Sequence, residues 1–388
     1  IALNYVSVTA FTRDAAGRVN GVEVHDALGD RPLTVQSACV FNAAGPWVDA
    51  VRRLDDTQAR NRLRPTKGVH ILTEAFVSKH AVVMRSASPA EKKPRVLFVI
   101  PYGGRTLIGT TDTDHHGPAD DARYLDEDVH ASPEEVRYLL DAVNQTFDVK
   151  LTEKDVISSY AGWRPLVAPP EAGVSESSIS REYEIFASDS GLFSIAGGKL
   201  TAFRSMAMHA VADVVDSLGR TDLKPSAIEG HPLSGSELEG KTLQAYLQTA
   251  RQHAPFAADL VETLVSRYGS NWPDLRRLLE ADASLGERIP GLSADQPHWF
   301  VEVVYALEHE GALTVSDFLM RRTRLHLLDQ NQALDAAEPV AARMAAWLGP
   351  RQGWDEAACD RWKRHQIASY EAEVARDRAA RSGAARQA

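Results

Sequence analysis

Two glycines followed by a lysine, Gly197-Gly198-Lys199, stand where an apolar strand pattern passes directly into a helix pattern. Glycines in such a turn let a ligand approach the bare backbone, and the first N–H groups of the helix favour an anion. Lys199 adds a full positive charge. The sequence therefore predicts a site for an anion, or for a ring system that becomes anionic when reduced, as a flavin does. The alternative is an ordinary strand-to-helix turn whose glycines serve packing.

Strand and helix patterns along the chain predict an α/β protein with a strand-rich α+β insert and a separate helical domain. Strands are expected at 3–12, 18–25, 33–42, 67–73, 80–85, 95–101, 105–111, 156–164, 183–187 and 192–196. The helix after Gly198 is predicted by the apolar residues Leu200, Phe203, Ala207, Val211, Val214 and Leu218, with Gly219 as its cap. After a linker at 225–236, helices are expected at 238–251, 257–268, 299–310 and 333–348, and a solvated or fraying helix from Ala368 onward.

The composition excludes several classes of protein. A formal net charge of −10 argues against a nucleic-acid binder, which normally has a basic face. Cys39 and Cys359 lie far apart and do not support a disulfide scaffold, which fits a reducing cytoplasm. No apolar run is long enough to predict a transmembrane helix. No metal site is predicted either, because the adjacent His115 and His116 lack any supporting helical or paired spacing.

Four further segments carry glycines or polar residues at the ends of expected strands. They are Val40-Phe41-Asn42-Ala43-Ala44-Gly45-Pro46-Trp47, Lys67-Gly68-Val69-His70, Ile108-Gly109-Thr110-Thr111-Asp112 and Ser159-Tyr160-Ala161-Gly162-Trp163-Arg164-Pro165-Leu166. In this order, with Gly197-Gly198-Lys199 after them, the segments resemble the FAD-dependent glycerol-3-phosphate dehydrogenases of the aerobic type, within the D-amino-acid-oxidase-like flavoproteins. The resemblance runs from Ile1 to about Phe203 and continues more weakly into the helical region.

The resemblance implies oxidation of sn-glycerol 3-phosphate to dihydroxyacetone phosphate, with FAD as the cofactor and a quinone or another electron acceptor as a partner. It implies a cytoplasmic location, and it leaves open both peripheral contact with the inner face of the cytoplasmic membrane and formation of a homodimer. Two rival interpretations remain. One is another FAD-dependent amino-acid or amine oxidase of the same group, whose substrate anion is usually a carboxylate. The other is a non-catalytic ligand-binding fragment.

The resemblance also implies three domains. They are a discontinuous Rossmann-like FAD-binding domain (1–62 and 188–224), a substrate domain (63–187) and a helical C-terminal domain (225–388). The opening strand, GxGxxG turn and helix of the family have no counterpart in this sequence, so we expect a truncated FAD-binding domain. We therefore expect the chain on its own to leave apolar faces uncovered, to be poorly soluble, to bind FAD weakly and to oxidise nothing.

Arg164 and His70 are the catalytic candidates. A guanidinium can hold a phosphate through two parallel hydrogen bonds, so Arg164 is expected to anchor the substrate; the alternative is a structural pair with a nearby acid. Histidine has a pKa suited to taking a hydroxyl proton, and the resemblance places His70 near the substrate hydroxyl. The alternatives are a hydrogen-bonded strand residue at His70 and proton transfer assisted by Arg164.

The other site residues are expected at strand ends. Lys199 would lie by the pyrimidine end of the flavin or by the substrate, and Thr111 would lie near the substrate, with a turn-forming role as its alternative. Trp47 is expected in the core. Arg321, Arg322 and Arg324 are expected on a solvated face, with contact to substrate phosphate or acidic lipid as the weaker alternative. The predicted cofactor-binding residues are Asn42, Ala43, Gly45, Pro46, Gly197, Gly198, Lys199, Leu200 and Thr201.

Overall fold

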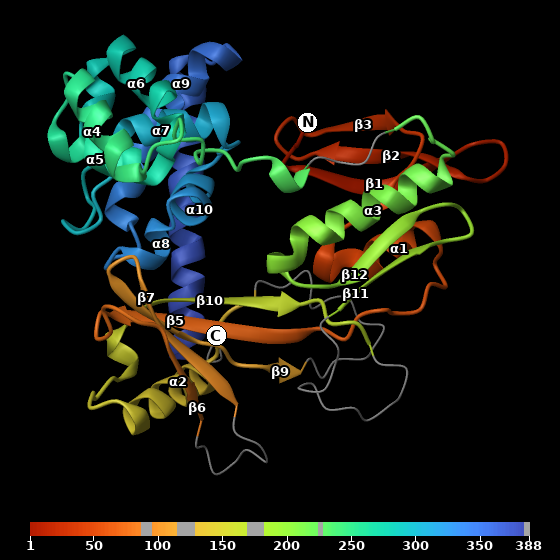
Figure 1. Cartoon of the computed structure of the whole chain (residues 1–388), viewed down its shortest axis with the longest axis horizontal. Helices are drawn as coiled ribbons and strands as arrows, with labels where there is room; N and C mark the ends of the chain where they lie inside the picture. The colour runs from red at the N-terminus through yellow and green to blue at the C-terminus, as the bar shows by residue number, and fades with distance from the viewer. Residues whose placement is uncertain (87–94, 115–128, 169–181, 224–227, 384–388) are drawn as a thin grey trace. The chain divides into compact units, whose positions relative to one another are not determined.

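The computed structural model describes residues 1–86, 95–114, 129–168, 182–223 and 228–383 (Figure 1). They form two compact units, each described by itself below. The first unit comprises Ile1–Val69, Thr110–His130 and Ala161–Gly230, and the second comprises His70–Gly109, Ala131–Tyr160 and His231–Ala388. Strands β5 (Thr66–Glu74) and β10 (Val156–Arg164) contribute residues to both units. The boundaries of the three expected domains stay a prediction.

The first unit contains two three-stranded sheets. In the antiparallel sheet the order is β1 (Val6–Arg13), β2 (Val19–Asp26), β3 (Arg31–Gln36). In the second sheet, β12 (Phe193–Gly197) lies between β11 (Tyr183–Ala187) and β4 (Phe41–Asn42). The strands predicted at 183–187 and 192–196 are both present as β11 and β12 and form an antiparallel hairpin, whereas β12 and β4 run parallel.

A helix follows each of the two parallel strands. After β4 come the 3₁₀ helix η1 (Gly45–Trp47) and α1 (Val48–Asp55), and after β12 come η5 (Leu200–Ala202) and α3 (Phe203–Ser217). Val48, Leu63 and Ala196 form a small buried cluster beneath them. A parallel strand pair in which each strand is followed by a helix is typical of α/β proteins, so the predicted α/β character of this unit is confirmed.

The apolar face of α3 is open in the described structure. The predicted helix is present, and Gly219 after it has the positive φ of 61° that is typical of a C-terminal cap. No residue of α3 is buried, however, and the exposed fractions of Leu200, Phe203 and Val211 are 88%, 50% and 57%. This exposure agrees with the expectation that the chain leaves apolar faces uncovered.

The second unit contains most of a larger sheet. Its order is β10-β5-β8-β7-β6, and the short β9 (Thr113–Asp114) pairs with the start of β5 in the first unit. The remaining strands are β6 (Val82–Arg85), β7 (Val96–Tyr102) and β8 (Arg105–Gly109). β7 and β8 form an antiparallel hairpin, whose turn residues Gly103 and Gly104 have φ angles of 58° and 80°. Glycine adopts this conformation without strain.

Helix α2 (Pro133–Thr146) begins at Ser132-Pro133-Glu134-Glu135, residue types that are typical of a helix N-terminus. The Ser132 hydroxyl accepts a hydrogen bond from Glu135 N (3.2 Å), and Ser132 N donates to Glu135 Oε2 (2.9 Å). This reciprocal capping box satisfies two N–H groups that the helix leaves unpaired. Val136, Leu139 and Val143 recur at intervals of three and four residues and are buried along one side of the helix.

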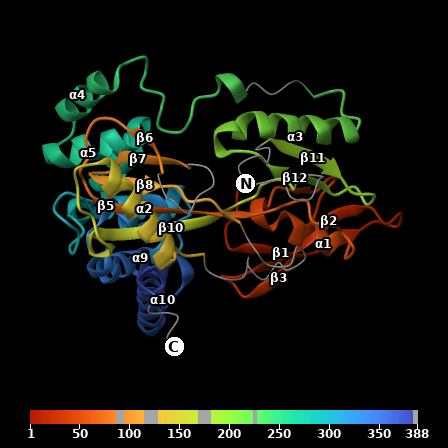
Figure 2. The ribbon, with the colours of Figure 1, turned by 90° about the horizontal axis from the view of Figure 1, so that it is seen from below.

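The rest of the second unit is helical (Figure 2). The helices are α4 (Leu243–His253), α5 (Ala258–Tyr268), α6 (Trp272–Ala281), α7 (Phe300–His309), the π-helix η9 (Asp317–Arg322), α8 (Leu325–Leu328), α9 (Ala337–Gln352) and α10 (Glu356–Ser382). They enclose two apolar cores, one centred on α4–α7 and the other on α7, η9, α9 and α10. The predicted separate helical region is confirmed.

The prediction of a solvated or fraying helix from Ala368 onward is wrong. Gln366, Tyr370, Val374 and Asp377 recur at intervals of three and four residues and are all buried. The Tyr370 hydroxyl donates to Gln332 O (2.5 Å), and the Asp377 carboxylate accepts hydrogen bonds from Ser159 Oγ and from Gln332 Nε2 (3.1 Å). Because most residues of α10 are charged or small, its composition did not reveal the narrow row of buried residues along one side.

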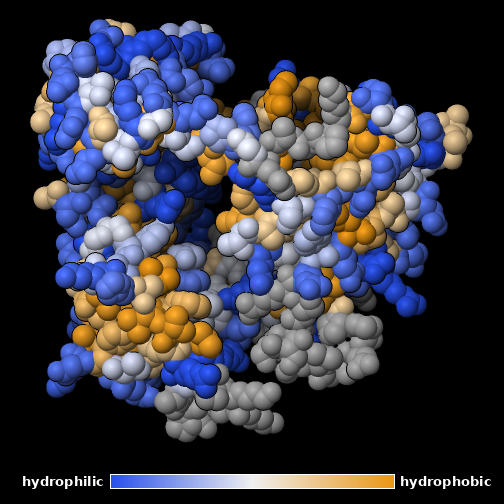
Figure 3. All heavy atoms as spheres, in the orientation of Figure 1, coloured by the Kyte–Doolittle hydropathy of each residue, from blue (hydrophilic) through white to orange (hydrophobic). Residues whose placement is uncertain are grey.

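Apolar surface is visible over the strands of the second unit in Figure 3. Exposed apolar side chains of β6 and β7 include Val83, Val96 and Phe98, and Val83 lies opposite Phe98 in the strand pair. Among the described residues, no helix has both the length and the apolar character needed to cross a membrane.

Candidate functional site

The parallel pairing of β4 and β12 brings two predicted cofactor-binding turns to one sheet edge in the first unit. Phe193 lies opposite Phe41 and Ser194 opposite Asn42 in parallel strands, so both strands end on the same side of the sheet. Ligands of open α/β sheets bind at this carboxyl edge, where the chain turns into helices. The structure thus brings together two sets of predicted residues that lie about 150 positions apart in the sequence.

The two glycines of the β12 turn require their backbone conformation. Gly197 and Gly198 have φ angles of 81° and 86°. An added Cβ would lie 2.4 Å from Glu182 O at Gly197 and 2.5 Å from Met206 Cε at Gly198. Lys199, Leu200 and Thr201 follow with exposed side chains at the start of η5. The turn therefore presents bare backbone and one lysine at the sheet edge.

Asn42 holds the facing turn together. Its buried side-chain amide donates from Nδ2 to Val48 O (3.0 Å), and its Oδ1 accepts from Ala44 N (3.2 Å). Ala43 is exposed, Gly45 has a φ of 56°, and Pro46 is half-buried. Small residues and a fixed backbone at this place allow a ligand to approach closely.

Arg164 is held by three neighbours in the first unit. Its Nη1 donates to Asp112 Oδ1 (2.9 Å), and its Nη2 donates to Thr110 Oγ1 (2.7 Å) and to Thr111 O (3.0 Å). An added Cβ on Gly68 would lie 2.3 Å from Nη2, so this glycine leaves room for the guanidinium. The contact with Asp112 is the acid pair of the structural alternative, and it also fixes the guanidinium plane, which two-point binding of an oxyanion needs.

Thr111 is buried and connects two strands. Its hydroxyl accepts a hydrogen bond from Val69 N (3.0 Å), and its own N–H donates to Val69 O (3.3 Å). These hydrogen bonds hold Thr111 against β5, next to Arg164, so Thr111 has a structural role. Its predicted substrate contact stays a prediction.

His70 lies in the second unit between a glycine and a tyrosine. Its ring stacks on that of Tyr160, with centroids 4.8 Å apart and planes 9° apart. On the paired strand β8, an added Cβ on Gly109 would lie 2.2 Å from His70 Cδ2. The ring is therefore fixed in place by its neighbours. Burial raises the pKa of Tyr160, with a further rise from Tyr102 and a partial offset from Arg324, so Tyr160 is a neutral stacking partner at pH 7.

Tyr160 was not singled out from the sequence, although it belongs to one of the motifs. Its contact with His70 depends on how strands about 90 residues apart are paired, which residue spacing does not reveal.

One prediction near the site is wrong, and one lies outside the described structure. Trp47 is 48% exposed and not in the core, because it ends η1 while Val48 takes the buried position next to it. His115 and His116 fall outside the described residues. Within the described ranges no group of three or more His, Cys, Asp or Glu is placed to hold a metal ion.

Comparison with known families matches nearly the whole chain. Residues 2–204 match the FAD dependent oxidoreductase family, and residues 227–359 match the C-terminal domain of alpha-glycerophosphate oxidase. The chain belongs to the FAD dependent oxidoreductase family. The family resemblance drawn from the five sequence motifs is confirmed.

Within this family, the chain is similar to several glycerol-3-phosphate dehydrogenases. The aerobic glycerol-3-phosphate dehydrogenases of Staphylococcus aureus strains USA300 and bovine RF122 are each 34% identical over 359 residues, which cover 89% of this chain and 60% of each relative. The X-ray structure of the glycerol-3-phosphate dehydrogenase from Bacillus halodurans, complexed with FAD, matches with a TM-score of 0.74 and 31% identity. That match covers 96% of this chain and 69% of the other. The match thus spans about three fifths of the length of the curated relatives.

Proposed function

We propose that this chain is part of an FAD-dependent dehydrogenase that oxidises sn-glycerol 3-phosphate to dihydroxyacetone phosphate. The observation that carries the proposal is the carboxyl edge of β4 and β12, where backbone without side chains and Lys199 meet. Similarity to glycerol-3-phosphate dehydrogenases over 89% of the chain supports it. We further propose a quinone as the electron acceptor and peripheral contact with the cytoplasmic face of the membrane; both rest on the family resemblance.

The residues at this edge fit FAD. Gly197 and Gly198 are half-buried, have no room for a side chain and hold positive φ angles, so only backbone is present at this point of the edge. Lys199 would balance the negative charge near the pyrimidine ring of a reduced flavin. Ala43, Gly45 and Pro46 would lie along the ribityl or pyrophosphate part, because their small side chains allow close approach. When bound, FAD supplies the hydride acceptor for this oxidation.

Two residues of this chain are proposed to act on the substrate. Arg164 would pair its positive charge with the phosphate, and Asp112, Thr110 and Thr111 hold its guanidinium plane. Two parallel hydrogen bonds to the phosphate would require Nη2 to give up a bond to Thr110 or Thr111. His70 would take the proton of the C2 hydroxyl on a ring nitrogen as the hydride leaves carbon, since the stacked ring is held in one orientation.

The experiment that tests the function compares three substrates. The chain is purified alone and also joined at its N-terminus to a strand–GxGxxG–helix segment, here named the extended protein, and FAD is added to both. Dye reduction by sn-glycerol 3-phosphate, matched by formation of dihydroxyacetone phosphate, is expected of the extended protein. Glycerol and D-amino acids are expected to give none. Dye reduction by an amino acid but not by glycerol 3-phosphate would favour an amino-acid oxidase and refute the proposal.

A further inference from the structure

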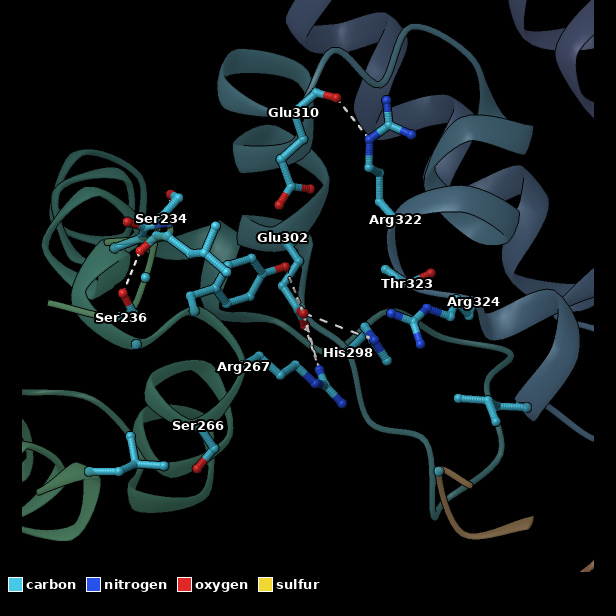
Figure 4. Close-up of a pocket in the computed structure, with 18 of the residues that line it drawn as sticks. Ser234, Ser236, Ser266, Arg267, His298, Glu302, Glu310, Arg322, Thr323 and Arg324 are labelled. Carbon is cyan, nitrogen blue, oxygen red and sulfur yellow. Dashed lines mark hydrogen bonds and ion pairs between the residues drawn. The ribbon is translucent and has the colours of Figure 1, made fainter. Parts of the chain in front are cut away.

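A cavity of about 800 Å³ lies within the second unit, and none of the predicted catalytic or cofactor-binding residues lines it. It is lined by the β7–β8 turn, the segment before α4, the end of α5, and the segment from α7 to η9 and α8 (Figure 4). This volume is typical of sites for small molecules. Its charged lining residues are Arg267, Glu302, Glu310, Arg322 and Arg324.

One acid of the lining is already neutralised. Glu302 is fully buried, and both of its carboxylate oxygens accept hydrogen bonds from Arg267 Nη1 (3.0 and 3.1 Å). Tyr268 Oη donates to the same carboxylate (3.1 Å). His298 beside it adds no charge at neutral pH, because burial lowers its pKa and the opposing effect of Glu302 does not restore it. The charges that remain for a ligand are those of Arg322, Arg324 and Glu310.

Each arginine is anchored by part of its guanidinium and keeps other donors for a ligand. Arg322 Nε donates to Glu310 O (2.8 Å) and Arg322 Nη2 to Gly311 O (3.3 Å), whereas its Nη1 makes no hydrogen bond to the described residues. Arg324 Nη1 donates to Tyr102 Oη, and its Nε and Nη2 have no such bond within the described structure. Figure 4 shows Arg267, Arg322 and Arg324 around the same open space.

Two backbone features place these arginines. Arg322 ends a π-helix, a rare conformation that is frequent at functional sites. Arg324 has a φ of 58°, a strained value for a residue with a side chain. Its guanidinium lies over the Tyr102 ring, 5.8 Å from the centroid, and both residues line the cavity. Arg321 and Arg324 are exposed, which agrees with the expected solvated face, whereas Arg322 is half-buried; Arg322 and Arg324 also line the cavity.

We propose that this cavity is a second ligand site, which binds a phosphate-type oxyanion through Arg322, Arg324 and the outer donors of Arg267. The charges of Arg322 and Arg324, with further hydrogen-bond donors on Arg267, suit a dianion with three oxygens better than a carboxylate, for which one bidentate arginine suffices. The carboxylate of Glu310 makes no hydrogen bond or salt bridge with the described residues, so it could accept a hydrogen bond from a hydroxyl group of the same ligand. The oxyanion is inorganic phosphate or the phosphate of a small hydroxylated molecule. The proposal goes beyond the proposed function and does not depend on it.

A local chemical footprint tests the site in the full chain. Phenylglyoxal modifies accessible arginines, and peptide mass spectrometry reports each position. Inorganic phosphate is expected to protect Arg324 and not Arg276, an exposed arginine that pairs with Glu280 on α6. If glycerol 3-phosphate protects Arg324 at a lower concentration than inorganic phosphate does, the ligand is a hydroxylated phosphate ester. If the two compounds protect Arg324 at equal concentrations, the site recognises the phosphate group alone. Protection by glycerol, or none by either phosphate, would overturn the proposal.

Calorimetry with variants separates this site from the proposed substrate anchor. Arg324→Gln is expected to weaken phosphate binding at least about tenfold, because a charged hydrogen-bond donor is lost. Arg276→Gln removes the same charge elsewhere and should leave the affinity unchanged. Arg164→Gln should leave the protection of Arg324 unchanged even if it abolishes oxidation. If Arg164→Gln removes phosphate binding and Arg324→Gln does not, the cavity is not a phosphate site, whatever the outcome for the proposed function.

Discussion

Replacing Gly109 by alanine should displace the proposed catalytic base. The added Cβ would lie 2.2 Å from His70 Cδ2, 2.6 Å from Cγ and 2.8 Å from Nε2. The first of these falls about 1.2 Å short of 3.4 Å, where ordinary contact begins. The ring has little freedom to move away, because Tyr160 stacks on it at 4.8 Å. Alanine at this position therefore moves the imidazole by about 1 Å or breaks the stack.

A displacement of about 1 Å at a reacting group costs roughly a hundredfold in rate. We expect Gly109→Ala in the extended protein to lower kcat for glycerol 3-phosphate by about 10²-fold, which is about 2.7 kcal/mol in the activation free energy. Loss of the stack should also lower the free energy of unfolding by about 1 kcal/mol. Dye-linked kinetics and urea unfolding measure the two effects.

Gly162→Ala is the matched control, since no heavy atom lies within 4 Å of a Cβ added there. It should retain wild-type kcat and stability. If Gly109→Ala also turns over glycerol 3-phosphate at the wild-type rate, the position of His70 does not matter for the reaction, and its assignment as the base is refuted.

Three further predictions concern single side chains. Arg164→Lys should raise KM for glycerol 3-phosphate roughly tenfold or more with flavin content unchanged, because lysine cannot make a planar two-point contact; an unchanged KM in steady-state kinetics would refute the anchor. His70→Asn should lower kcat about 10²-fold and remove one ionisation from the pH–rate profile, whereas an unaltered profile would assign the proton to another group. Burial raises the pKa of Asp55, but hydrogen bonds from Ser190, Ser188 and Arg13 outweigh it and hold that pKa below its usual value of 3.8. Asp55 therefore stabilises the fold at pH values above 3.8 and loses this effect as the pH falls through its lower folded-state pKa, so urea unfolding of Asp55→Asn should show a smaller loss of stability in acid than wild type.

Much of this structure follows from local patterns in the sequence. Gly197 and Gly198 are predicted from the strand-to-helix change, and their positive φ angles show why no other residue suits the turn. The capping box at Ser132 is equally local. Features that need distant partners could not be predicted: the stacking of Tyr160 on His70 depends on the strand order, and the buried stripe of α10 depends on a core built by other helices.

In the candidate site, too, individual residues could be predicted from local sequence patterns, whereas contacts between distant residues could not. The sequence singled out Gly68, His70, Gly109 and Arg164 as parts of motifs, but not that Gly68 makes room for Arg164 and Gly109 for His70. The contacts of Gly68 with Arg164 and of Gly109 with His70 depend on how close neighbouring strands lie, and those strands are neighbours only in the folded sheet. The cavity of Arg322 and Arg324 is assembled from segments more than 200 residues apart, so spacing could only predict a basic cluster there.

Anaerobic reduction of bound flavin tests the central claim most directly, because it needs no electron acceptor. The extended protein is loaded with FAD and titrated with sn-glycerol 3-phosphate while the visible absorbance of the flavin is recorded. The account predicts stoichiometric bleaching by sn-glycerol 3-phosphate, none by glycerol, and strongly weakened bleaching at the same concentration in Arg164→Gln. A protein that binds FAD and keeps its full colour at saturating glycerol 3-phosphate would contradict the account.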